Sequence, residues 1–234
     1  MFKRINKKLS GWMRAARGEL KTPWQRFLGR LEFYFGDHAI FRMLYLNKHT
    51  VAPGVFRSAQ PSPGHIRQFA KDGIKTVVNL RGERDCAGDT FEREACEAAG
   101  IALIDCPLRS RGLPKRELLH ETIAMMRSLN KPALVHCKSG ADRAGFWSAL
   151  YLMVAEDQPV AVAKQQLSLR YGHVRQGKTG LLDHFFDAYE AHHAATGESL
   201  ETWIDTVYEP WPLKLEFQST WWGTVLTDWI LRRE

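Results

Sequence analysis

The chain has 234 residues, 44% hydrophobic and 25% charged, which allows one large domain with a buried core or a smaller domain with extensions. The net charge of +7 comes entirely from residues 1–36, where nine basic side chains face two acidic ones, so the neutral remainder is not expected to bind nucleic acid. The four cysteines form no CxxC pair, which argues against a disulfide scaffold or a zinc site and favours a reducing cytoplasm.

The chain order of elements can be predicted from its apolar patterns. Residues 1–36 have the spacing of an amphipathic helix, with a break near Thr22 caused by Pro23. Short β-branched or apolar runs then alternate with helical patterns, one of which ends at Gly100. The predicted strands are 54–58, 74–80, 101–105 and 133–136, and the predicted helices are 63–69, 92–99, 114–129 and one from about 143.

This alternation predicts an α/β fold with a central, mostly parallel sheet flanked by helices. Ligands bind at the carboxyl ends of the strands in such sheets. The loop after strand 133–136 begins at this edge with Cys137, so we expect the functional site there. The longest nearly apolar run, Phe146 to Ala155, is about half a membrane span and predicts a buried helix.

The sequence His136-Cys137-Lys138-Ser139-Gly140-Ala141-Asp142-Arg143 carries the chemistry. A loop that opens a helix presents backbone N–H groups and the positive end of the helix dipole, which favours both a thiolate and a bound phosphate. Gly140 allows close approach of the backbone, and the guanidinium of Arg143 can clamp two phosphate oxygens. His136 is expected to order the loop by hydrogen bonds.

Two other interpretations apply to the same cysteine. A lone cysteine after a strand is usually a small buried hydrophobe, but the accompanying glycine and arginine favour a reactive group. A sulfur-transferring rhodanese also has a loop cysteine, whereas an arginine six residues after Cys137 favours phosphate.

The loop resembles the HCxxGxxR signature of the protein tyrosine phosphatase superfamily, above all its dual-specificity and atypical branch, which includes lipid-directed members. Residues 55–61 and 76–81 are similar to the opening strands of atypical bacterial members, and the likeness covers roughly 50–190. The resemblance implies a cysteine-phosphatase fold and a two-step reaction without metal or cofactor. Cys137 would attack phosphorus while Arg143 stabilises the oxygens, and water would then hydrolyse a phosphocysteine. The residues implied in substrate binding are His136, Lys138, Ser139, Gly140 and Ala141.

Two positions depart from the family pattern. The general acid is usually an aspartate about thirty residues before the cysteine; Asp105 has that distance but ends a predicted strand, and the loop 108–113 has no acidic residue. Asp142, inside the signature, is the rival that we prefer, although a salt bridge is its alternative role. Ala144 stands where the family has Ser or Thr, which predicts a slow second step.

The resemblance and the charge pattern suggest a highly anionic substrate. Lys138 resembles a lysine of inositol-lipid phosphatases. Further positive charge is expected from Arg109, Arg111, Arg170, His173, Arg175 and Lys178.

Three parts are predicted: a basic amphipathic segment (1–36), the phosphatase domain (37–195) and a tryptophan-rich extension (196–234). Residues 1–36 have the character of a membrane-surface helix, so one hypothesis is a cytoplasmic phosphatase at the inner membrane face that acts on phosphoproteins or on phosphoinositide or phosphatidylglycerophosphate-type lipids. The alternatives are a soluble tyrosine or dual-specificity phosphatase and a non-catalytic phosphate-binding module. Trp221 and Trp229 are expected on one helical face, for packing or for a lipid interface.

Overall fold

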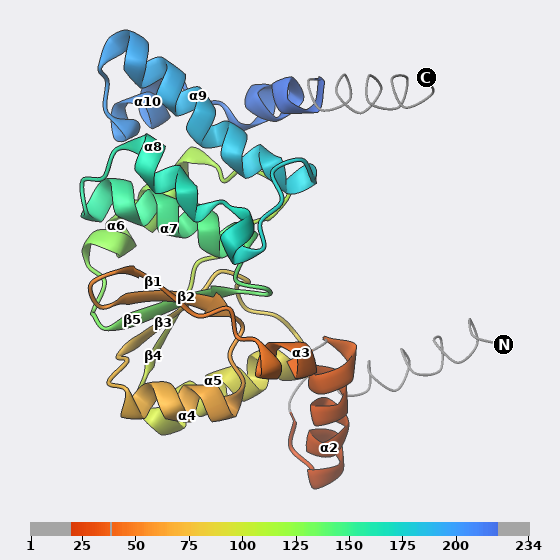
Figure 1. The fold of residues 1–234 in the computed structure, drawn as a ribbon. Coiled ribbons are helices and arrows are strands. Elements are labelled where there is room, and N and C mark those ends of the chain that lie inside the picture. Colours follow the sequence, from red (N-terminus) through yellow and green to blue (C-terminus); the bar gives the residue numbers. More distant parts are fainter. Residues whose placement is uncertain (1–19, 38, 220–234) are drawn as a thin grey trace, which may run out of the picture. The chain divides into compact units, whose positions relative to one another are not determined.

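The computed structural model describes residues 20–37 and 39–219 (Figure 1). The chain divides into two compact units, one made of Met1–Pro107 with Asn130–Gly140 and the other of Leu108–Leu129 with Ala141–Glu234. The amphipathic start predicted for 1–19 and the helical face predicted for Trp221 and Trp229 lie outside the described residues.

The first unit contains a five-stranded sheet in the order β1-β2-β5-β3-β4. Its strands are β1 (His49–Ala52), β2 (Val55–Ala59), β3 (Thr76–Asn79), β4 (Ala102–Asp105) and β5 (Ala133–Cys137). All neighbours are parallel except β1 and β2, so the predicted mostly parallel sheet and its four predicted strands are confirmed. β1 was not predicted, because this short edge strand has only alternate partial burial and a bulge in its pairing.

Two helices of the first unit begin at residues that cap them with their side chains. Thr22 caps α2 (Pro23–Leu31) in a reciprocal pair with Gln25, which confirms the predicted break. Ser62 caps α4 (Pro63–Lys71) in the same way. α5 (Ala87–Ala99) starts five residues before the predicted 92 and ends in the left-handed Gly100, as predicted. The π-helical turn Glu32–Gly36 and α3 (Ala39–Leu44) complete this unit.

One face of the sheet is covered by α4 and α5 (Figure 1). The apolar cluster between them consists of buried side chains from both helices, from β3 and β5 and from the loops that precede β3 and β4: Ile66, Phe69, Ile74, Val77, Cys96, Ile101 and Leu134. This core fixes β5, the strand that carries the cysteine, from one side.

The second unit is helical. α6 (Arg116–Arg127) begins two residues after the predicted Pro114, and α7 (Asp142–Ala155) begins one residue before the predicted 143. Sequence patterns did not predict the remaining elements: α8 (Val160–Ala163), the 3₁₀ turns Lys164–Gln166, Leu169–Tyr171 and Lys178–Gly180, α9 (Leu181–Thr196) and α10 (Leu200–Thr206). Aromatic rings of Phe146, Phe185 and Trp203 meet in its core, so this tryptophan is a packing residue.

Candidate active site

Cys137 is the last residue of β5, the central strand of the sheet. Only 2% of it is exposed, and it pairs in register with Ala59 of β2. Residues 138–141 follow as a loop, and α7 begins at Asp142. The predicted sequence of strand, cysteine loop and helix is therefore present.

The loop is held by its carbonyl groups. The backbone N–H of Gln60 donates to the oxygen of Lys138 (3.3 Å), and the side-chain amide of Asn47 donates to that of Ser139 (3.0 Å). The guanidinium of Arg57 donates to the oxygen of Gly140 (2.7 Å). Three successive carbonyls are thus turned toward donors of the first unit.

Gly140 is required by its backbone conformation and by its surroundings. Its φ is +76°, a region that L side chains rarely adopt. A Cβ here would lie 2.7 Å from the nitrogen of Ala59 and 2.8 Å from the carbonyl carbon of Ser58. The loop therefore packs directly on the end of β2.

Three buried polar side chains next to Cys137 are linked to one another: His136, Glu92 and Gln60. The Nε2 of His136 is 2.6 Å from Oε1 of Glu92, and both residues are buried. The other oxygen of this carboxylate accepts from the amide of Gln60 (2.7 Å). The Nδ1 of His136 lies 3.3 Å from the carbonyl oxygen of Cys137, so the predicted role of the histidine in ordering the loop has a structural basis.

Lys138, the residue after Cys137, is paired with a carboxylate. Its ammonium is 3.0 Å from the carboxylate of Asp37, which also binds Arg42 and Arg81. Burial raises the pKa of Asp37, but the hydrogen bonds and charges of these cations outweigh it and hold the pKa well below its usual value. Asp37 is therefore ionised at neutral pH.

Asp105 ends β4 in the first unit. Its carboxylate accepts from the guanidinium of Arg93 (2.6 Å) and from the amide of Asn79 (2.9 Å). Arg93 also binds Asp89 (2.7 Å). Asp105 thus lies in a network of hydrogen bonds that ties β4 to β3 and α5.

Asp142, in the second unit, is paired with a buried histidine. Its Oδ1 is 2.8 Å from Nδ1 of His173, whose Nε2 is 2.7 Å from Asp183. Burial lowers the pKa of His173, but the two carboxylates outweigh it and raise the pKa to about 9. The imidazole is therefore protonated at neutral pH and links both carboxylates.

Substrates with different leaving groups can show which aspartate, Asp142 or Asp105, is the general acid. We expect Asp142→Asn to lose on the order of 10²-fold in turnover, and more with a poor leaving group, because only an acid's loss grows as the leaving oxygen becomes more basic. Asp105→Asn is the matched control and is expected to stay within about threefold of the wild type. Steady-state rates on nitrophenyl and alkyl phosphates measure both; the reverse pattern would assign the acid to Asp105.

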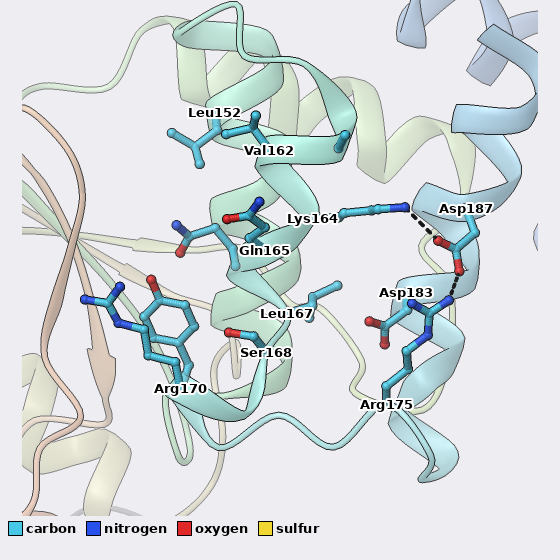
Figure 2. Close-up of a pocket in the computed structure, with 13 residues that line it drawn as sticks. Leu152, Val162, Lys164, Gln165, Leu167, Ser168, Arg170, Arg175, Asp183 and Asp187 are labelled. Atoms are coloured by element: carbon cyan, nitrogen blue, oxygen red, sulfur yellow. Dashed lines mark hydrogen bonds and ion pairs between the residues drawn. The ribbon is translucent and has the colours of Figure 1, made fainter. Parts of the chain in front are cut away.

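The cations predicted to enrich the rim differ in their surroundings. His173 is buried, whereas the others are exposed: Arg109, Arg111, Arg170, Arg175 and Lys178. The second unit contains a cavity of about 590 Å³. Figure 2 shows Lys164 and Arg175 on its wall, both directed at Asp187. Two of the cations on this wall, Lys164 and Arg175, are therefore paired with a carboxylate.

Sequence reasoning missed most of the residues that support the loop: Asp37, Asn47, Arg57, Gln60 and Glu92. Two of them left a signal. Arg57 is a charged residue inside a mostly buried strand, and Glu92 shares a helical face with the buried Cys96, four residues later. A buried charge requires a partner, so both positions indicate a polar network. The others could be found only from the fold.

The sheet order, the strand that ends in Cys137 and the loop that opens a helix define the dual-specificity phosphatase class of fold. Residues 47–178 match the family model described as PTP-SAK, a Swiss Army Knife protein, DSP-PTPase phosphatase domain. This range is more than half of the chain, and the chain belongs to that family.

Solved structures show the same fold at low identity. A mutant form of Tk-PTP aligns with a TM-score of 0.51 at 19% identity, covering 64% of this chain and 97% of that one. A putative phosphatase from Shewanella putrefaciens CN-32 aligns with a TM-score of 0.50 at 22% identity, covering 64% and 95%.

A curated relative is similar over part of its length. The dual specificity protein phosphatase TpbA of Pseudomonas aeruginosa (strain UCBPP-PA14) is 24% identical over 125 residues, which are 52% of this chain and 54% of the relative. The chain thus spans about half the length of the curated relatives it matches. Within the described residues, the helices are all too short or too polar to cross a bilayer.

Proposed function

We propose that the protein is a cysteine-dependent phosphomonoester hydrolase that forms a phosphocysteine intermediate on Cys137. The observation that carries this proposal is the fixed direction of three successive carbonyl groups, those of Lys138, Ser139 and Gly140. In a trans peptide the N–H points opposite to the C=O, so the N–H groups of these peptide units turn away from their carbonyl partners. We infer that these N–H groups face the same side of the loop and form a cradle for an anion.

The reaction follows from the groups in and around this loop. The Cys137 thiolate attacks phosphorus in line, so that an S–P bond forms as the P–O bond to the leaving group breaks. Arg143 and the loop amides stabilise the oxygens of the transferred phosphoryl group. The proton for the leaving oxygen is the one held by the hydrogen-bonded pair of Asp142 and protonated His173; Asp142 passes it on, and the pair regains a proton from the water that cleaves the S–P bond. Inorganic phosphate then leaves.

Family membership supports phosphatase chemistry, and the name of the relative TpbA supports phosphorylated side chains of proteins as one source of substrate. An aryl phosphate carries the same phosphomonoester group as a phosphorylated protein or lipid. Its hydrolysis therefore tests the phosphatase reaction without identifying the natural substrate. The lipid alternative depends on residues 1–36, of which 1–19 lie outside the described residues.

The intermediate itself tests the proposal. Ala144, fully buried in the first turn of α7, has no hydroxyl to assist departure of the thiolate, so the second step should be slow. We expect rapid mixing with an aryl phosphate to give a burst of about one product per protein before a slower steady state. Ala144→Ser is expected to raise the steady-state rate several-fold.

Acid quenching during turnover should leave one phosphate on the peptide that contains Cys137, detectable by mass spectrometry. The Cys137→Ser protein, which lacks the thiol, provides the blank. Hydrolysis without phosphate on this peptide would exclude the intermediate. Phosphate binding without any hydrolysis would instead identify a non-catalytic phosphate-binding module.

A further inference from the structure

Several cations converge on a single carboxylate beside the loop. The carboxylate of Asp37 lies 2.8 Å from Arg42, 3.0 Å from Arg81 and 3.0 Å from Lys138. The two guanidinium side chains are only 9% and 7% exposed, so water screens them poorly. One negative charge therefore faces three positive ones.

Arg84 adds a fourth cation with spare hydrogen-bonding capacity. Its charge interacts with Arg81 and Asp37, and also with Cys86 and Asp89 of the first unit. The Nε and Nη2 atoms of Arg84 are buried, and neither has a hydrogen-bond partner among the described residues. Buried guanidinium donors normally have acceptors, so these two indicate a group that the protein does not supply.

The cavity of Figure 2 offers an internal comparison. There Arg175 and Lys164 bind Asp187, and Lys164 also binds Glu190, so these two cations share two carboxylates. Around Asp37, in contrast, three cations share one carboxylate.

The cluster adjoins the candidate active site through covalent and hydrogen bonds. Lys138 follows Cys137 in the chain, and Gln60 bonds the carbonyl of Lys138 while its own side-chain oxygen accepts from Arg81. Asp37 and Arg42, in contrast, precede the range 47–178 that matches the family. The segment before the family domain thus completes the cluster.

We propose that Arg42, Arg81, Arg84 and Lys138 form a second anion site, in which the carboxylate of Asp37 is a built-in occupant that a second phosphate group of the substrate displaces. This inference rests on the proposed function, and it defines the substrate as a phosphomonoester that carries a further phosphate nearby. The compound is either soluble or the headgroup of a lipid.

Because the carboxylate of Asp37 already occupies the cluster, we expect the incoming group to be a phosphate and not the carboxylate of a peptide. An incoming carboxylate would exchange one singly charged acceptor for another and would lose against the tethered Asp37. A phosphate carries more charge and three acceptor oxygens, so it can also engage the spare donors of Arg84.

The test is calorimetric binding to the Cys137→Ser protein in metal-free buffer. The probes are inorganic phosphate, pyrophosphate and tripolyphosphate, of which the latter two present a second charge at different spacings. We expect at least one of the two longer anions to bind about tenfold or more tightly than inorganic phosphate. If the loop alone binds the anion, the affinities of the longer anions and of phosphate should be nearly equal. Equal binding of all three would overturn the proposal.

Single substitutions assign the effect to the cluster. Arg84→Gln should reduce the affinity ratio several-fold, whereas Arg175→Gln removes the same charge from the paired site and should not. Asp37→Asn should increase the ratio, because it removes the competing carboxylate; a decrease would show that Asp37 only supports the fold and would contradict the proposal. Thermal melts check that each variant is folded.

Two further arms complete the design. The first arm compares binding to vesicles that contain a bisphosphorylated lipid with binding to pyrophosphate at the same phosphate concentration. Tighter binding to the vesicles supports a lipid as the source of the second phosphate group. Tighter binding to pyrophosphate supports a soluble compound. Selective competition by an acidic monophosphorylated peptide would overturn the choice of phosphate. Hydrolysis of aryl phosphate by the wild type reports on the proposed function separately, so either idea can fail alone.

Discussion

Replacing Cys137 with serine is expected to reduce hydrolysis of an aryl phosphate by about a thousandfold or more. A serine hydroxyl is a weak nucleophile without an adjacent base, whereas any cysteine thiol ionises far more readily and is the stronger nucleophile. The His136 imidazole is already engaged with Glu92 and the carbonyl of Cys137, so it is not free to activate a hydroxyl. Initial rates of product release for both proteins measure the loss.

Cys86→Ser is the matched control. Cys86 is a free, half-buried thiol of the same unit, at the start of α5, and its replacement should leave the rate unchanged. The Cys137→Ser protein should still bind inorganic phosphate, because the proposed cradle uses backbone groups and Arg143 and does not require the thiol. Full activity of this variant, or equal loss in the Cys86 variant, would remove Cys137 from the mechanism.

The central part of the fold could be predicted because its signals are local. The parallel strands β2, β3 and β5 are short and mostly buried runs, and α5 has a clear stop at Gly100. The second unit was less predictable, because α9 is buried along much of its length and has little contrast between its faces. Its aromatic residues pack on distant partners that no local pattern reveals.

The candidate site shows the same division. The loop 137–143 could be identified because one contiguous segment holds the thiol, the glycine and the arginine. Its supports come from elsewhere in the chain: Arg57 from β2, Glu92 from α5 and Asp37 from the segment before β1. Only the fold brings these residues to the loop. The sequence could therefore indicate that a buried charge needs a partner, but it could not identify that partner.

Replacing Gly140 with alanine is expected to be the most damaging change of a single methyl group in the first unit. The added Cβ would meet backbone atoms of Ser58 and Ala59 at 2.7–3.0 Å, and these atoms belong to a strand held on both sides by the sheet. The positive φ adds strain. We expect a loss of about 2–4 kcal/mol in the free energy of unfolding, measured by urea denaturation.

The activity of Gly140→Ala should fall further than its loss of stability explains. Per folded molecule, we expect a loss of about a hundredfold or more. The reason is that relief of the clash moves the loop off the end of β2 and breaks the hydrogen bond from Arg57 to the Gly140 carbonyl. Gly100→Ala separates the two causes. Gly100 also has a positive φ (+66°), but no atom lies within 4 Å of its added Cβ. This variant should lose only about 1 kcal/mol and keep its turnover. If both variants behave alike, contact between the loop and β2 does not shape the phosphate cradle.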